Sequence, residues 1–177
     1  MHNYSDEELY KEFMVTHGSR RRKAFDFLYS RYSRPLTQYF YFAFHHDFEK
    51  ARDFFHDLFL KILETPEKFD TSMKFKPWIF RVAANMCKNE FRKEEVVNRY
   101  KDHAKNNLAD NIELNLQEIK LNEGLRILGP RQRSLIVLRF KINLSIKEMA
   151  EIFECPEGTV KSRLFYAIKE LSEYYKN

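Results

Sequence analysis

The fold is decided by SIKEMAEIFECPEGTVKSRL, residues 145–164. Two segments with helical spacing of apolar residues lie on either side of a short break at 154–157. Ser145 is placed as a helix N-cap, with Glu148 at the capping-box position. Two short helices joined by so tight a turn, with the small residue Ala150 where they cross, predict a helix-turn-helix.

The second helix of this motif begins with polar and basic side chains. In a helix-turn-helix these first turns meet DNA, and the free N–H groups at the start of a helix favour phosphate. The candidate DNA contacts are Thr159, Lys161, Ser162 and Arg163.

A second candidate surface lies on a helix predicted to begin near Pro77, where the missing N–H of proline is harmless. Its apolar residues form one stripe, and cations and amides recur every three or four residues on another face. That ridge contains Arg81, Asn85, Lys88, Asn89 and Arg92. Amides can contact base edges and cations can contact phosphates, as expected of a helix that binds nucleic acid.

The charge distribution also points to this helix as a nucleic-acid-binding segment. The chain has 31 Lys and Arg against 26 Asp and Glu, a net charge of +5. Residues 72–105 alone carry 9 basic and 4 acidic residues, interleaved with Phe and Trp. A basic, aromatic segment suits a polyanion because phosphate contact releases counterions and rings can stack on bases. On charge alone, a solvated helix face explains the pattern equally well.

Composition predicts an all-α protein. The 177 residues include 4 Gly and 5 Pro, which favours long helices, and 28 aromatic residues, which supply packed cores. In the N-terminal half, a short helix over 3–17 is expected to begin with a Ser5/Glu8 capping box, and the periodicity that follows is interrupted or restarted at Pro35.

Two small helical domains joined by a flexible linker are therefore predicted. The first covers 1–94, a polar, Asn-rich linker covers 95–117, and the helix-turn-helix domain covers 118–177. A flexible linker of this length spans about 27 Å on average, so the two domains could contact separate places on one long ligand.

Two blocks of the sequence resemble a known family. Segments in 24–62, together with Phe69-Asp70 and FKPWIFRVAAN at 75–85, look like the promoter-melting domain of bacterial RNA polymerase sigma factors. LGPRQR at 128–133, LRF at 138–140 and most of 144–164 look like the second, upstream-element domain of the same family. With only these two domains and a short linker, the chain resembles the extracytoplasmic-function (ECF) group.

The resemblance implies roles for particular residues. Asp53, Asp57 and Lys61 match the segment that binds the clamp helices of core RNA polymerase. The 69–76 loop and the following helix match the elements that recognise the downstream promoter element and hold a flipped base, and the resemblance adds Tyr166 and Lys169 to the upstream-element contacts. The downstream set is Phe75, Lys76, Arg81, Asn85, Lys88, Asn89 and Arg92.

The resemblance also implies partners and a mode of action. It implies binding to core RNA polymerase and to promoter DNA, regulation by an anti-sigma factor, and no catalytic site, cofactor or metal. The sequence departs from the family at Glu154, which replaces a turn glycine, at Tyr166 and Ile168, which replace arginines, and at the tandem Met73-Lys74.

Other classes of protein are less consistent with the sequence. His45, His46, Asp47, Asp53, His56 and Asp57 cluster in sequence, but a second helix lacks the matching ligands of a metal enzyme. A polymerase-independent helix-turn-helix regulator stays open as an alternative function.

Three further expectations concern the cysteines, Trp78 and membrane insertion. Cys87 and Cys155 fit inert core thiols better than redox sensors. Trp78 fits either core packing or a DNA contact. Without a long apolar stretch or a signal-peptide pattern, no membrane insertion and a cytoplasmic location are expected.

Overall fold

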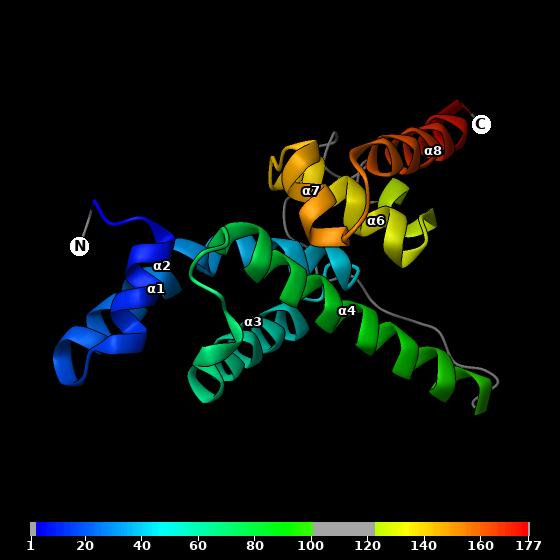
Figure 1. The fold of residues 1–177 in the computed structure, drawn as a ribbon. Coiled ribbons are helices and arrows are strands. Elements are labelled where there is room, and N and C mark those ends of the chain that lie inside the picture. Colours follow the sequence, from blue (N-terminus) through cyan, green and yellow to red (C-terminus); the bar gives the residue numbers. More distant parts are fainter. Residues whose placement is uncertain (1–2, 101–122, 177) are drawn as a thin grey trace.

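The computed structural model describes residues 3–100 and 123–176. All regular secondary structure in these two ranges is helical, which confirms the predicted all-α class (Figure 1). In chain order, the helices are α1 Asp6–Val15, α2 Gly18–Ala43, α3 Phe48–Glu64, η1 Pro66–Lys68, α4 Phe75–Tyr100, α6 Pro130–Ile136, η2 Val137–Lys141, α7 Ile146–Phe153 and α8 Glu157–Lys176.

Helix α1 begins as its sequence predicts. The Ser5 hydroxyl accepts from the Glu8 N–H at 3.1 Å, and the Glu8 carboxylate accepts from the Ser5 N–H at 2.7 Å. The Asp6 carboxylate then binds the Arg31 guanidinium and the Tyr32 hydroxyl, both on α2. Helix α1 is thus capped at its start and fixed to α2 by the same turn.

Helix α2 is continuous through Pro35, where the sequence predicted an interruption or a restart. An interior proline removes one helical hydrogen bond and costs about 3 kcal/mol. The flanking turns offset this cost, because Tyr32, Leu36 and Tyr39 are all buried. Tertiary packing therefore overrides the helix-breaking tendency of Pro35.

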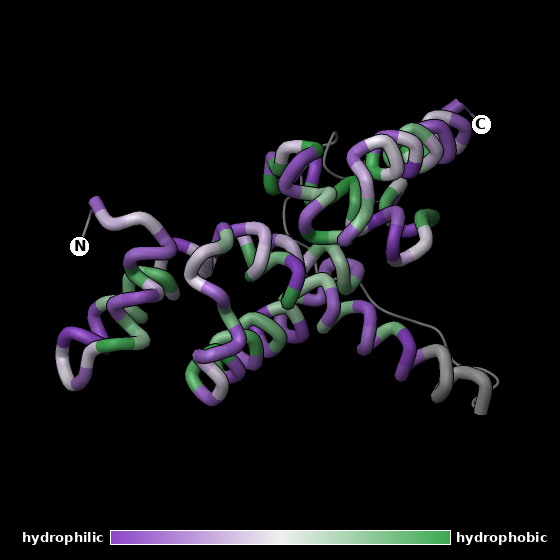
Figure 2. The backbone as a smooth tube through the Cα atoms, viewed as in Figure 1, coloured by the Kyte–Doolittle hydropathy of each residue, from purple (hydrophilic) through white to green (hydrophobic). Residues whose placement is uncertain are grey.

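The first domain has an aromatic core. Phe75, at the start of α4, is completely buried, and the rings of Tyr10, Tyr32 and Phe69 lie 5.2–5.3 Å from it, centroid to centroid. Helices α1–α4 pack around this core and the stripe that continues along α3 (Figure 1). Hydrophobic and hydrophilic residues alternate around α3, as in an amphipathic helix (Figure 2).

The second domain contains the predicted helix-turn-helix, α7 and α8. Ser145 caps α7, and the predicted capping box with Glu148 is present. Glu154 ends α7 in the left-handed conformation, with φ 50° and ψ 48°, a conformation that favours glycine. A non-glycine residue in this conformation costs about 1–2 kcal/mol.

The two domains pack against each other (Figure 1). Helix α7 lies along the N-terminal half of α4, and α6 lies against the C-terminal end of α2. The wholly buried Tyr39 on α2 exchanges a 2.6 Å hydrogen bond with Ser134 on α6.

Arg133 is the buried charge in this domain contact. Its guanidinium donates to the carbonyls of Leu125, Leu128 and Ala43 at 2.9–3.0 Å. It also lies 2.8 Å from His45 Nε2, which accepts because guanidinium has no acceptor atom. Burial lowers the pKa of Arg133 to about 10, which still leaves it charged at neutral pH.

The predicted boundaries at 94 and 118 stay predictions, and most of the predicted 95–117 linker lies outside the described residues. Helix α4 itself continues to Tyr100. Within the described residues, no helix has both the length and the apolar character needed to cross a bilayer.

Candidate nucleic-acid interface

The predicted ridge of α4 is divided into an exposed part and a covered part. Asn85, Lys88, Asn89 and Arg92 are all exposed to solvent on consecutive turns of the helix. The opposite side of α4 is buried, with Ile79 and Ala83 wholly inaccessible. The exposed part presents two amides and two cations in one line, as nucleic-acid binding requires.

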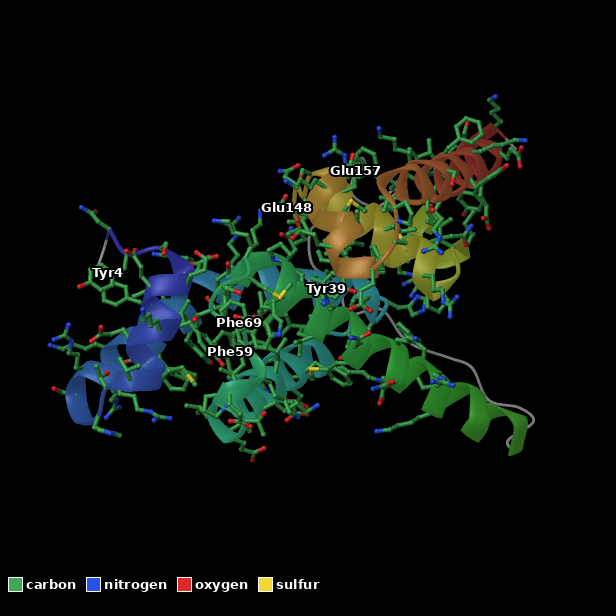
Figure 3. All side chains as sticks on the ribbon, in the orientation of Figure 1. Tyr4, Tyr39, Phe59, Phe69, Glu148 and Glu157 are labelled. Atoms are coloured by element: carbon green, nitrogen blue, oxygen red, sulfur yellow. The ribbon has the colours of Figure 1, made fainter. Side chains whose placement is uncertain are left out.

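The first turns of α4, including Arg81 of the ridge, face the helix-turn-helix domain. Lys76 Nζ lies 2.9 Å from Glu148 Oε1, and Arg81 Nη1 lies 2.9 Å from Glu154 Oε1. Both acceptors are on the side of the second domain that faces α4, and Figure 3 marks Glu148 there. Burial opposes ionisation of Glu148, but hydrogen bonds from Ser145 and Lys76 hold its pKa below the usual value.

Two predicted aromatic positions lie in the core of the first domain. Phe75 has no exposed surface, so its side chain is unavailable for the direct DNA contact predicted from the sequence. Trp78 is half-buried, and its ring lies 4.9 Å from Phe69 and 5.5 Å from Phe75. The structure thus favours the core-packing interpretation of Trp78.

Helix α8 presents the predicted upstream-element residues to solvent. Its inner face is a buried stripe of Val160, Leu164, Ala167 and Leu171. Thr159 is half-buried, and the other predicted contacts are exposed: Lys161, Ser162, Arg163, Tyr166 and Lys169. Arg163 also lies 3.8 Å from the Cys155 sulfur, and Lys169 is 3.8 Å from Glu173.

Phe165 is a further candidate on α8 that the sequence analysis missed. It is 64% exposed and lies three residues after Ser162 and four before Lys169, on the same face. An apolar side chain at such a position can contact a thymine methyl in the major groove. Its helical spacing from Ser162 and Lys169 is the feature of the sequence that could have identified it as a candidate DNA contact.

The predicted polymerase-binding residues share the exposed side of α3. Asp53, Asp57 and Lys61 are all exposed, one turn apart. Leu60 and Leu63 are also exposed, at 53% and 41%, although the sequence analysis did not name them. Apolar side chains beside charges are typical of a protein-binding surface.

Cys87 is buried in the core of the first domain, and Cys155 is half-buried just before α8. Burial raises the pKa of the Cys87 thiol, which keeps it protonated and unreactive. Among the described residues, no three His, Cys, Asp or Glu side chains come together as a metal site.

Fold and surfaces together define a two-domain, all-helical DNA-binding protein with one basic helix and one helix-turn-helix. Two family models match the chain: Sigma-70 region 2 over residues 28–96, and Sigma-70, region 4 over residues 124–173. The ECF RNA polymerase sigma-E factor of Haemophilus influenzae is 30% identical over 166 residues, covering 82% of this chain and 84% of the relative. This chain belongs to the ECF group of RNA polymerase sigma factors.

Other relatives agree. The RNA polymerase sigma-H factor of Pseudomonas aeruginosa is 27% identical, and the match covers 86% of each chain. The sigma factor RpoE from Bartonella quintana, solved with the anti-sigma factor NepR, is 26% identical, with a TM-score of 0.64 over 83% of this chain and 95% of that one. CnrH, solved with the cytosolic domain of CnrY, shares the fold, with 20% identity and a TM-score of 0.73 over 97% of each chain.

Proposed function

We propose that this chain binds core RNA polymerase through α3 and directs it to promoters through α4 and α8. The observation that carries the proposal is the pair of exposed polar and basic faces, one on each domain. The ridge of α4 suits single-stranded DNA, because cations contact phosphates and a positive groove offsets the few kcal/mol that unstacking a base costs. The chain acts without a catalytic centre of its own.

The downstream-element surface in this proposal consists of Lys76, Arg81, Asn85, Lys88, Asn89 and Arg92. Phe75 supports it from the core. Lys76 and Arg81 are paired with Glu148 and Glu154, so DNA contact with either cation would compete with these ion pairs. Arg81 Nε is buried without a hydrogen-bond partner among the described residues, which weakens the closed contact because an unmet buried donor costs about 1–3 kcal/mol.

The upstream-element surface in this proposal consists of Thr159, Lys161, Ser162, Arg163, Tyr166 and Lys169, with Phe165 added from the structure. The proposed cellular location is the cytoplasm, where core polymerase and promoter DNA are found. The proposed regulator is an anti-sigma factor, since the solved relative RpoE is bound to one.

Removing the acids of α3 should separate polymerase binding from promoter opening. Asp53→Ala combined with Asp57→Ala should weaken binding to core polymerase more than it weakens opening at saturating protein, because both carboxylates are exposed on the proposed contact face. Asn85→Ala should do the reverse. Affinity for labelled core enzyme and permanganate reactivity of the promoter measure the two effects.

Asp26→Ala is the matched control, because Asp26 is an exposed acid on another helix. It should change neither quantity. Equal effects of the α3 and α4 substitutions on both measurements would contradict the assignment of separate surfaces.

Substitutions on α8 should weaken recognition of the upstream element alone. Lys161→Ala or Arg163→Ala should each cost about 1–3 kcal/mol of affinity if the cation contacts a base or a desolvated phosphate. Fluorescence anisotropy of holoenzyme on an upstream-element duplex measures this loss. Lys176→Ala, at the far end of the same helix, is the control, and a loss as large as that of Lys161→Ala would indicate nonspecific charge attraction.

A further inference from the structure

Helix α1 lies outside the matched family regions, which begin at residue 28, yet it contacts the loop that precedes α4. This loop, residues 65–74, connects α3 to the ridge helix. Its residues from Phe69 onward belong to the segment that, by its resemblance to sigma factors, holds a flipped promoter base. Its position relative to α4 therefore matters for promoter opening.

Side chains of α1 hold both ends of this loop. The Tyr10 hydroxyl donates to the Pro66 carbonyl at 2.8 Å, where the loop begins. Glu7 Oε1 accepts from the Phe75 N–H at 2.8 Å, where the loop ends and α4 starts. This N–H is one of the first four in α4 that lack a helical partner, so a carboxylate from another helix takes the place of a local cap.

The Tyr10 ring also packs on one aromatic residue within the loop and on two in the first turn of α4. Its centroid lies 4.9 Å from that of Phe69, 5.3 Å from Phe75 and 6.0 Å from Trp78. Figure 3 shows Phe69 in the interior of the first domain, close to these packed helices. Burial raises the pKa of the Tyr10 hydroxyl, so it stays protonated and able to donate.

Helix α1 is itself fixed in place. The contacts of Asp6 with Arg31 and Tyr32 join its first turn to α2, and Tyr32 also packs against Phe75. The loop itself has one further ordered turn, in which the Ser72 N–H donates to the Asp70 carboxylate at 2.9 Å. Helix α1 is one of the elements that tie this loop to the rest of the domain, together with α3 and α4.

We propose that Glu7 and Tyr10 are positioning residues that hold the 65–74 loop in the geometry needed for base capture, an inference that rests on the proposed function. They touch no DNA in this account. They act by fixing where the loop begins and where α4 begins. Loss of either contact leaves the α3 and α8 surfaces intact and reduces the equilibrium extent of promoter opening.

The test compares Glu7→Ala, Glu7→Gln and Tyr10→Phe in the full chain with core polymerase. Glu7→Ala and Tyr10→Phe should each reduce the equilibrium extent of promoter opening about two- to tenfold, the effect of losing one hydrogen bond. Glu7→Gln keeps an oxygen acceptor and should restore most of the opening. Lys11→Ala, an exposed change on the same helix, is the control. Core affinity and upstream-element binding should stay unchanged in all four variants.

Trp78, the single tryptophan, gives a second measurement that needs no polymerase. Acrylamide quenching of its fluorescence should rise in Glu7→Ala and Tyr10→Phe and stay at the wild-type level in Glu7→Gln. If the wild-type chain opens the promoter and Glu7→Ala and Tyr10→Phe open it to the same extent, the positioning role is overturned. If the wild-type chain opens no promoter, the proposed function fails, and unchanged Trp78 quenching would then overturn the loop contact independently.

Discussion

Phe75→Ala is expected to lower the free energy of unfolding by about 3–5 kcal/mol, the usual cost of removing a buried aromatic ring. Phe75 has no exposed surface, and four aromatic rings lie 5.2–5.5 Å from its centroid. Urea unfolding followed by circular dichroism measures the change. Promoter opening should fall only in proportion to the unfolded fraction.

Phe165→Ala is the matched control for Phe75→Ala. Its side chain is 64% exposed, so removing it should change the free energy of unfolding by about 0.5 kcal/mol or less. A loss below 1 kcal/mol in Phe75→Ala, together with defective opening by fully folded protein, would contradict the core assignment. That result would instead support the direct DNA contact of Phe75 predicted from the sequence.

Arg133→Met is expected to lower the free energy of unfolding by about 3–5 kcal/mol, similar to the effect of breaking a buried ion pair. The methionine fills much of the space but leaves the carbonyls of Leu125, Leu128 and Ala43 without their donor. Because Ala43 belongs to the first domain, the contact between the domains should also weaken. Urea unfolding measures the first effect, and the radius of gyration from small-angle X-ray scattering measures the second.

Arg131→Met is the control, because Arg131 is exposed on the same helix, α6. It should leave both quantities at their wild-type values. If Arg133→Met were as stable and as compact as Arg131→Met, the buried guanidinium would not hold the domains together.

The sequence was sufficient for features that depend on local spacing. Both capping boxes, at Ser5 and Ser145, lie where their sequences place them. The stripe of α8 and the exposed ridge from Asn85 to Arg92 also follow from helical periodicity. These signals span a few residues each, so a single sequence contains them in full.

Features that depend on distant contacts could not be predicted. Phe75 lies in a basic, aromatic segment that resembles a DNA surface, but α1 and α2 bury it. Arg133 binds a carbonyl 90 residues away, and Glu7 binds an N–H 68 residues away. No spacing rule connects such positions, so the domain contact and the role of α1 emerge only from the structure.

The ion pairs of Lys76 with Glu148 and of Arg81 with Glu154 neutralise part of the positive charge of the first domain. The excess of positive charge lies in 72–105, and α7 covers part of it with carboxylates. Free protein should therefore bind random DNA weakly.

The most direct test of the account is permanganate footprinting of promoter DNA with core polymerase, with and without this protein. The account predicts reactive thymines at the downstream element only when core enzyme and this protein are both present, followed by run-off transcripts from that site. Tight DNA binding by the protein alone, with no association with core enzyme and no open promoter, would contradict it and favour a polymerase-independent regulator.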